Sequence, residues 1–97
     1  MQIFGKIKID QFISKHAITK NALEYWIEVV ESSKWKNHAE LKQTFPSADY
    51  VGEARYVFNI KGTGYRIVAV VVFVAGTFSI RFIGTHDEYN KIDCKTI

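Results

Sequence analysis

The sequence of 97 residues has a single cysteine, Cys94, and a single proline, Pro46. One cysteine excludes an internal disulfide framework, and with three scattered histidines it does not give the spacing of a metal site. The longest apolar run, IVAVVVFVAG, is much shorter than the roughly 20 residues that span a membrane. The N-terminus also lacks a secretory signal. We therefore expect a cytoplasmic protein that has no membrane partner and needs no metal or other cofactor.

Aromatic residues, in contrast, are plentiful: seven Phe, five Tyr and two Trp. Apolar residues make up 47% of the chain, which is enough for one packed core. At this length we expect a single domain over residues 1–97.

The net charge of +3 comes from one part of the chain. Basic and acidic residues balance in residues 1–31 and again in residues 67–97. The excess lies in residues 32–66, where six basic side chains stand against three acids: Lys34, Lys36, Lys42, Arg55, Lys61 and Arg66 against Glu40, Asp49 and Glu53. A local basic region suits a polyanion such as nucleic acid, although an ordinary solvated surface has the same composition.

Two helices are predicted near the N-terminus. Residues 6–16 place Ile7, Phe12 and Ile13 at roughly helical spacing, with lysines between them. The segment TKNALEYWIEVVESS follows, with Thr19 as its predicted N-cap. Its apolar stripe is Ala22, Leu23, Trp26, Ile27 and Val30. We expect Trp26 to lie in the core.

From Arg55 onward, alternation and β-branched residues predict three strands, RYVFNIK, YRIVAVVVFV and TFSIRFIGT. Tight turns are predicted at Gly62-Thr63 and Ala75-Gly76, and MQIF is a candidate short strand. Residues 32–53 are predicted to be a connector with one helical turn after Asn37. The sequence thus predicts an α+β fold, in which two N-terminal helices pack on a small antiparallel sheet of three to four strands and a short helix follows at the C-terminus.

Two-residue hairpin loops would fix the register of these strands. Asn59 would then face Arg66 in the first hairpin. In the second hairpin Arg81 would face Val70, while Thr85 would face Arg66. Alternation assigns nine apolar side chains to the face that meets the helices: Tyr56, Phe58, Ile60, Ile67, Val71, Phe73, Phe78, Ile80 and Phe82. The opposite face would carry all three arginines with polar residues: Arg55, Asn59, Lys61, Arg66, Ser79, Arg81 and Thr85.

The stretch RFIGTHDEYNKID begins like a strand and ends like a short helix. Thr85 and Glu88 have the spacing of a capping box, so a helix is predicted to begin beside Arg66. His86 and Tyr89 would share one side of that helix. A purely structural role is the alternative, in which Tyr89 packs on the sheet and His86 is a solvated first-turn residue.

Arginine, histidine and tyrosine without metal ligands fit metal-free RNA cleavage, in which the 2′-hydroxyl attacks the adjacent phosphate. Arg66 and Arg81 suit stabilisation of the transition-state charge. His86 suits the role of base or acid, and Tyr89 that of orienting the phosphate, stacking on a base or assisting proton transfer. A phosphate-binding loop is excluded, since KGTGY lies between two strands and does not precede a helix.

Three segments, LKQTFPSADYV, RYVFNIKGTGYRIVAVVVF and IRFIGTHDEY, closely resemble the HigB-type toxins of bacterial toxin–antitoxin systems, members of the RelE-like superfamily. The resemblance covers about residues 34–92 and extends to the order and length of the preceding helices. It implies a RelE-like fold and a toxin that cleaves mRNA in the ribosomal A site. It also implies a HigA-type helix-turn-helix antitoxin as the neutralising partner.

Carried over to matching positions, the resemblance points to four catalytic residues: Arg66, Arg81, His86 and Tyr89. RelE-type enzymes often use two lysines near the first hairpin of the sheet. This chain has Arg55, Asn59 and Lys61 there, and we expect these three to bind RNA. Lys34 and Lys36 are further candidates, because the connector interleaves basic and aromatic residues.

Two other functions remain open on the sequence alone. The same basic face suits a non-catalytic module that binds RNA or protein. A toxin-like fold that persists only as a regulator or antitoxin partner is the other alternative.

Overall fold

The computed structural model describes residues 1–62 and 64–97, so the predicted Gly62-Thr63 turn lies partly outside the described residues. Its elements follow one another along the chain as β1 (Gln2–Phe4), α1 (Lys6–Lys15), the 3-10 turn η1 (Ala17–Thr19), α2 (Lys20–Ser32), α3 (His38–Thr44), β2 (Asp49–Gly52), β3 (Arg55–Ile60), β4 (Tyr65–Val72), β5 (Thr77–Thr85) and α4 (His86–Tyr89). In the described part of the chain, no helix combines the length and apolar character needed to cross a membrane.

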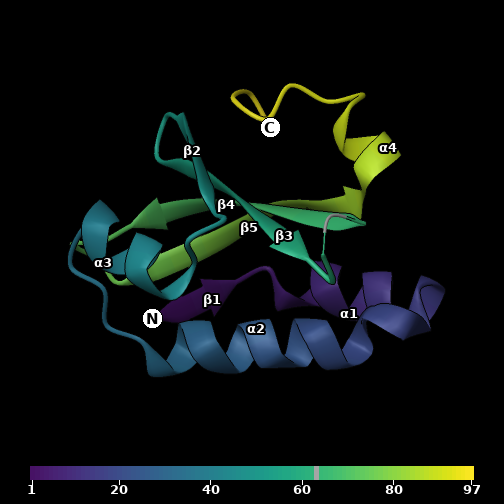
Figure 1. Ribbon diagram of the computed structural model, residues 1–97, viewed down its shortest axis with the longest axis horizontal. Helices are drawn as coiled ribbons and strands as arrows, with labels where there is room; N and C mark the ends of the chain where they lie inside the picture. Colours follow the sequence, from purple (N-terminus) through teal and green to yellow (C-terminus); the bar gives the residue numbers. More distant parts are fainter. Residues whose placement is uncertain (63) are drawn as a thin grey trace.

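The strands form one sheet in the order β1-β5-β4-β3-β2. β1 pairs with β5 in parallel, and all other neighbours are antiparallel. Helices α1 and α2 cover one face, while α4 and the C-terminal segment lie on the other side of the sheet (Figure 1). The α+β class and the two-layer arrangement predicted from the sequence are confirmed. The sheet has five strands because β2, which lies in the predicted connector, adds an edge strand beside β3.

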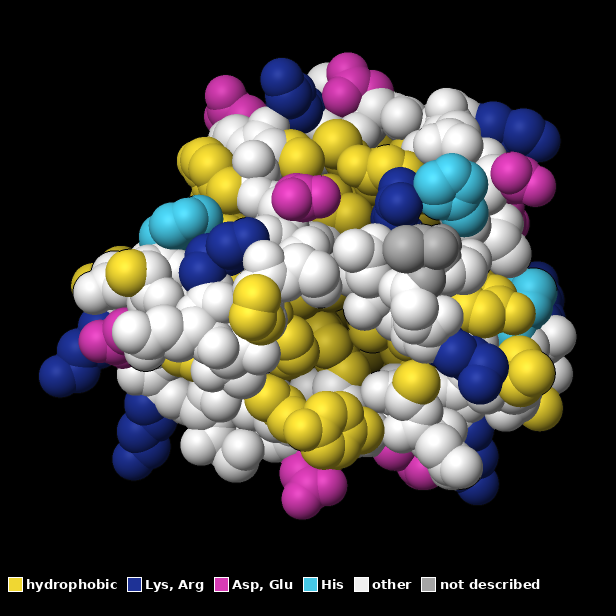
Figure 2. Space-filling model, viewed as in Figure 1, with side chains coloured by type: hydrophobic (Ala, Val, Ile, Leu, Met, Phe, Trp, Pro, Cys, Tyr) yellow, Lys and Arg dark blue, Asp and Glu magenta, His cyan; other side chains and the backbone are white. Residues whose placement is uncertain are grey.

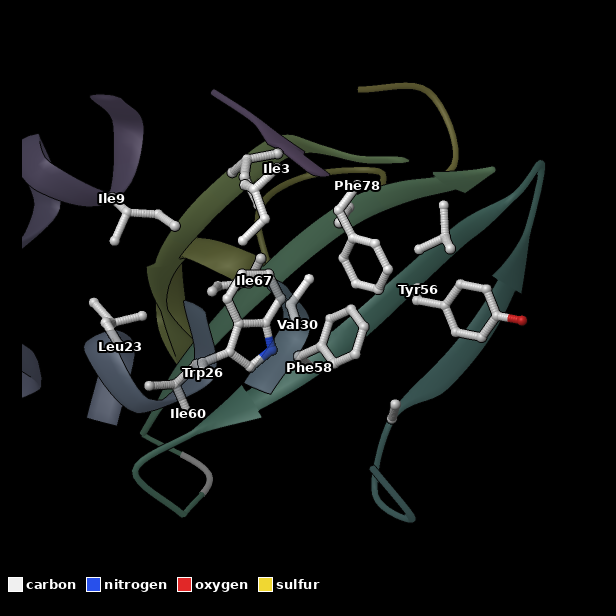
Figure 3. Close-up of a cluster of buried hydrophobic side chains, with 14 of the residues drawn as sticks. Ile3, Ile9, Leu23, Trp26, Val30, Tyr56, Phe58, Ile60, Ile67 and Phe78 are labelled. Carbon is white, nitrogen blue, oxygen red and sulfur yellow. The ribbon is translucent and has the colours of Figure 1, made fainter. Parts of the chain in front are cut away.

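The core lies between α2 and the sheet. Trp26, Leu23 and Val30 bury the inner face of α2, as the apolar stripe predicts. The Trp26 ring packs edge-on against Phe58 and Phe78, with ring centroids 5.3 and 6.0 Å apart (Figure 3). Edge-to-face packing of this kind suits the charge distribution of aromatic rings and fixes their relative orientation.

The connector contributes to the core as well. Trp35 is buried, its indole N–H donates to Thr44 Oγ1 at 3.0 Å, and its ring packs against Phe45. Asn37 caps α3, because its side-chain oxygen accepts from the backbone N–H of Glu40 at 3.0 Å. Trp35 therefore seals the edge of the core, and the lysines beside it remain exposed.

The predicted register holds in the first hairpin, where Asn59 pairs with Arg66. In the second hairpin it is wrong. β4 ends at Val72, which pairs with Thr77, so residues 73–76 form the loop and Val70 pairs with Ser79 in place of Arg81. A continuous apolar run carries no alternation that marks its end, which is why the sequence did not locate this turn.

A β-bulge at Arg81 shifts the register again. Ala69 pairs with Ile80 and Val68 with Phe82, so Arg81 is the extra residue on β5. Side chains after the bulge change face. Phe82 therefore moves to the outer face, away from the helices, and Gly84, in place of Thr85, becomes the neighbour of Arg66.

Candidate functional site

Three side chains meet on the outer face of the sheet: Asn59 of β3, Arg66 of β4 and Tyr89 of α4. We refer to them as the Arg66 cluster. Asn59 and Arg66 are cross-strand partners, and Arg66 Nε donates to Asn59 Oδ1 at 3.0 Å. The guanidinium carbon of Arg66 lies 4.8 Å from the centroid of the Tyr89 ring, which is a cation–π contact. These contacts hold the guanidinium plane from two sides.

Tyr89 is held in place by the start of α4. Thr85 Oγ1 accepts from the backbone N–H of Glu88 at 3.2 Å, and Glu88 Oε1 accepts from the backbone N–H of Thr85 at 2.8 Å. This is the capping box that the sequence predicts. The Tyr89 ring also packs on Phe82, with centroids 6.5 Å apart, a contact that exists because the bulge turns Phe82 outward.

The Tyr89 phenol is a proton donor at neutral pH. Burial raises the pKa of Tyr89 to about 12, and its hydrogen bond to Cys94 Sγ at 3.6 Å contributes in the same direction. The nearby Asp49 carboxylate also raises this pKa, whereas Arg66 lowers it. A phenol of this kind donates hydrogen bonds and does not act as a base.

Asp49 and Cys94 are neighbours of the Arg66 cluster that the sequence did not indicate. Asp49 lies on β2, opposite Val57, in a segment predicted to be a connector. Cys94 comes from the C-terminal segment, for which no structure was predicted. Acidic residues and a lone cysteine carry no pattern of their own, and only the pairing of β2 and the path of the last residues bring them here.

Arg55 lies on the same face but at the other end of β3. Asn59 lies four positions further along the strand, or about 13 Å away. Its guanidinium is engaged by main-chain oxygens: Nε and Nη2 donate to Ile97 at 3.1 and 2.6 Å, and Nη1 donates to Glu53 at 3.0 Å. Arg55 therefore anchors the C-terminal segment over this face of the sheet.

Arg81 and His86 lie beside the Arg66 cluster without joining it. Arg81 is exposed at the bulge and lines a groove of about 320 Å³ with Lys8, Lys15 and His16 of the N-terminal helical region. Arg81 can approach a phosphate at Arg66 only through the length of its side chain. His86 is exposed at the first position of α4, and its backbone N–H donates to the carbonyl of Gly64 at 3.0 Å.

The three lysines predicted to bind RNA are spread over the surface. Lys61 is exposed in the first hairpin turn, with a φ of 53°. Lys34 and Lys36 are exposed in the connector between α2 and α3. Both line a hollow formed with the N-terminus and the loop between β4 and β5, well away from the Arg66 cluster in the fold.

No group of three or more His, Cys, Asp or Glu side chains that could hold a metal ion occurs in residues 1–62 and 64–97. The side chains of the Arg66 cluster supply chemistry of their own. A guanidinium with a fixed orientation and a protonated phenol together can bind an oxyanion and stabilise added negative charge on it.

Comparisons with known proteins point to one family. Residues 19–92 match the model of a family described as HigB_toxin, the RelE-like toxic component of a toxin–antitoxin system. The chain is 26% identical over 94 residues to a protein named mRNA interferase HigB from Escherichia coli O6:H1 strain CFT073, covering 95% of this chain and 91% of that protein. It is 41% identical over 59 residues to a protein named mRNA interferase toxin HigB from Escherichia coli strain K12, covering 58% of this chain and 56% of that protein. A protein named mRNA interferase HigB from Shigella flexneri matches to the same extent.

Proposed function

Because the chain belongs to the HigB family of RelE-like toxins of toxin–antitoxin systems, we propose that it is an endoribonuclease that cleaves mRNA in the ribosomal A site and so inhibits translation. The names of its relatives support the substrate, since they are mRNA interferases. The Arg66 cluster supports the chemistry, since it presents oxyanion-binding groups on a sheet face that carries no helix of the α1–α2 layer.

The proposed reaction needs no metal ion. The 2′-oxygen of the nucleotide attacks the adjacent phosphorus and gives up its proton to a base, and the bond from phosphorus to the 5′-oxygen breaks. The departing 5′-oxygen receives a proton, which leaves a 2′,3′-cyclic phosphate and a 5′-hydroxyl. His86 is the proposed base or acid, because imidazole accepts and donates protons near neutral pH.

Arg66 and Tyr89 are proposed to stabilise the transition state. The guanidinium binds the non-bridging phosphate oxygens with its Nη groups, since Asn59 already engages Nε. Tyr89, protonated because its pKa is raised to about 12 by burial, is proposed to turn its hydroxyl away from Cys94 Sγ and to donate a hydrogen bond to the same phosphate. Arg81 is proposed to reach the same phosphate through the length of its side chain. Asn59, Lys61, Lys34 and Lys36 are proposed to hold the rest of the RNA or the ribosome through its phosphates. Arg55 is proposed to join them by exchanging its bonds to the main chain of residues 53 and 97 for a phosphate.

The observation that carries this proposal is the contact of Arg66 with both Asn59 and Tyr89. Induced expression of the chain should arrest growth, and Arg66→Ala and Tyr89→Phe should each remove the arrest. Removing one donor to a transition-state oxyanion typically slows a reaction about 10²–10³-fold. Tyr89→Phe keeps the ring on Arg66 and Phe82, so its folded state is preserved. Tyr25→Phe, at an exposed tyrosine of α2, is the matched control and should remain toxic.

Full toxicity of both site variants would contradict the assignment of these residues. The antitoxin is proposed to be a HigA-type helix-turn-helix protein encoded next to this chain, and its co-expression should restore growth. Tight binding to ribosomes or RNA without cleaved message would instead identify a non-catalytic binding module.

A further inference from the structure

A second surface with the character of a ligand site lies where α3 begins beside β2 and β3. This aromatic pocket has a volume of about 530 Å³, within the range of about 300–1,000 Å³ typical of ligand sites. Its lining residues are Lys36, Asn37, His38, Tyr50, Ala54, Tyr56, Val71 and Phe73. All of them belong to the described part of the chain, and none is acidic.

Three rings in the pocket are arranged around one another. The ring centroid of Tyr56 lies 5.1 Å from that of Tyr50 and 5.6 Å from that of His38, and Tyr50 meets His38 edge-on at 6.0 Å. Tyr56 is buried, and Figure 3 shows its hydroxyl pointing away from the core cluster. Tyr50 is 53% exposed, so its ring offers area to a further planar group.

A hydrogen bond sets the polar character of the pocket. His38 Nδ1 and the Tyr56 hydroxyl lie 2.7 Å apart. Burial, and secondarily Tyr50, raises the pKa of Tyr56, so the hydroxyl keeps its proton and is able to donate it to His38 Nδ1. A neutral imidazole that accepts at Nδ1 carries its own proton on Nε2. In this tautomer His38 offers an N–H donor, and Lys36 adds a positive charge on the same rim.

We propose that the aromatic pocket binds an unpaired nucleobase of the RNA, which stacks on Tyr50 and accepts a hydrogen bond from His38 while Lys36 contacts the adjoining phosphate. Stacking on aromatic side chains with a cation nearby is the usual chemistry by which proteins hold single-stranded RNA. An apolar side chain of a protein partner would leave the His38 N–H and Lys36 without partners. The inference rests on the proposed function, which supplies the RNA.

Strand β2 connects this pocket to the Arg66 cluster. β2 is the edge of the sheet and spans only Asp49–Gly52. Successive side chains of a strand point to opposite faces, and here Asp49 influences Tyr89 on the outer face while Tyr50 lines the pocket. An RNA strand on the Arg66 cluster therefore reaches the aromatic pocket by passing around one short edge strand. On the α3–β2 side of Figure 2 a histidine lies among hydrophobic side chains at the surface.

The experiment measures binding separately from cleavage. Arg66→Ala protein, which is expected to leave RNA uncut, is titrated with adenosine and uridine 5′-monophosphates and with a short single-stranded RNA, and the ring signals of Tyr50 and His38 are followed by NMR. These signals should shift, and Tyr50→Ala in the same background should weaken RNA binding about tenfold, the loss of one stacked base. Tyr25→Ala, at an exposed tyrosine outside the pocket, should bind as before. Since Tyr50 is half exposed, its replacement leaves the core intact.

Two results would overturn the inference: ring signals that do not move, or equal RNA affinity with and without Tyr50. A Tyr50→Ala protein that binds RNA normally but no longer binds a co-expressed antitoxin would identify the pocket as a protein contact and would also overturn it. If the wild type binds bases here yet cleaves no message on ribosomes, the proposed function fails and the pocket assignment stands.

Discussion

At the scale of single residues, Arg66 is already oriented before any substrate arrives. Its Nε is bonded to Asn59 and its guanidinium lies over the Tyr89 ring, so few of its rotamers remain accessible. A fixed donor loses little entropy when it binds a phosphate, and it stabilises developing charge without reorganisation. The side chain of Arg55, in contrast, is already occupied by the main chain of residues 53 and 97. This difference is the reason for assigning the central role to Arg66.

The ionisation of Tyr89 gives a prediction at this scale. Burial, with the Cys94 hydrogen bond, raises its pKa to about 12, whereas an unfolded tyrosine ionises near a pKa of about 10. Above about pH 10, the Tyr89 phenol loses its proton in the unfolded state but keeps it in the folded state. The contribution of Tyr89 to stability should therefore be present at neutral pH and fall as the pH rises from about 10 towards 12.

Urea unfolding of the wild type and of Tyr89→Phe, compared from pH 8 to pH 12, measures this effect as a steeper loss in the wild type. Equal pH slopes for the two proteins would show that the Tyr89 phenol is not shielded in the folded state.

Glu88 gives a second prediction, of opposite sign. The Glu88 carboxylate accepts a hydrogen bond from the backbone N–H of Thr85, and this bond lowers the pKa of the carboxyl. The Thr85 side chain, His16 and Lys15 lower the pKa by smaller amounts. In the unfolded chain a glutamate has a pKa of about 4.3, and in the folded protein the pKa of Glu88 is lower. The ionised carboxylate therefore stabilises the folded state at any pH above about 4.3. This stabilisation is lost as the pH falls through the folded-state pKa. Glu88→Gln keeps an oxygen for the capping box but removes the charge.

The free energy of unfolding of Glu88→Gln, measured by urea denaturation, should therefore fall less than that of the wild type between pH 6 and pH 3. Asp87→Asn, a neighbouring exposed carboxylate on α4, is the control. If Asp87→Asn differed from the wild type by as much as Glu88→Gln does, the effect would come from general surface charge and not from the capping box.

At the scale of elements, features that depend on local sequence spacing were predicted more successfully than features that depend on long-range geometry. The apolar stripe of α2, the capping box of α4 and the pairing of Asn59 with Arg66 follow from spacing alone. The second hairpin did not follow, because an unbroken apolar run marks neither the end of β4 nor the bulge at Arg81. That bulge places Phe82 beneath Tyr89, so this contact of the site depends on a feature without a sequence signal.

The joint between β1 and α1 gives a prediction for an element. Gly5 has a φ of 91°, and a Cβ there would lie 3.3 Å from Ile80 Cβ on β5. Both the backbone conformation and the close approach disfavour a side chain, so Gly5→Ala should lower the free energy of unfolding by about 1–3 kcal/mol. The matched control is Gly64→Ala, whose added Cβ would meet no atom closer than 3.8 Å.

Chemical denaturation of both variants tests this expectation. Equal stability of Gly5→Ala and the wild type would show that β1 and the start of α1 shift away from β5 at little cost.

At the scale of the whole molecule, the sheet separates two tasks. Its inner face binds α1 and α2 through the aromatic core, and its outer face carries the Arg66 cluster. The C-terminal segment lies on the outer side of the sheet (Figure 1). Composition and alternation were enough to predict this layering and the pairing of Asn59 with Arg66. They did not predict that residues 93–97 fold back to Arg55, nor that β2 brings Asp49 to Tyr89, since both depend on the path of the complete chain.

The central claim is that this outer face cleaves RNA by attack of the 2′-hydroxyl. The most direct measurement uses ribosomes programmed with a message that carries a single 2′-deoxynucleotide at the cleaved position, with the all-ribose message beside it. We predict that the wild type cuts the all-ribose message to a 2′,3′-cyclic phosphate and a 5′-hydroxyl, leaves the substituted message intact at that position, and loses both products in Arg66→Ala. Cleavage that persists at the deoxynucleotide, or that is unchanged in a folded Arg66→Ala protein, would contradict the account.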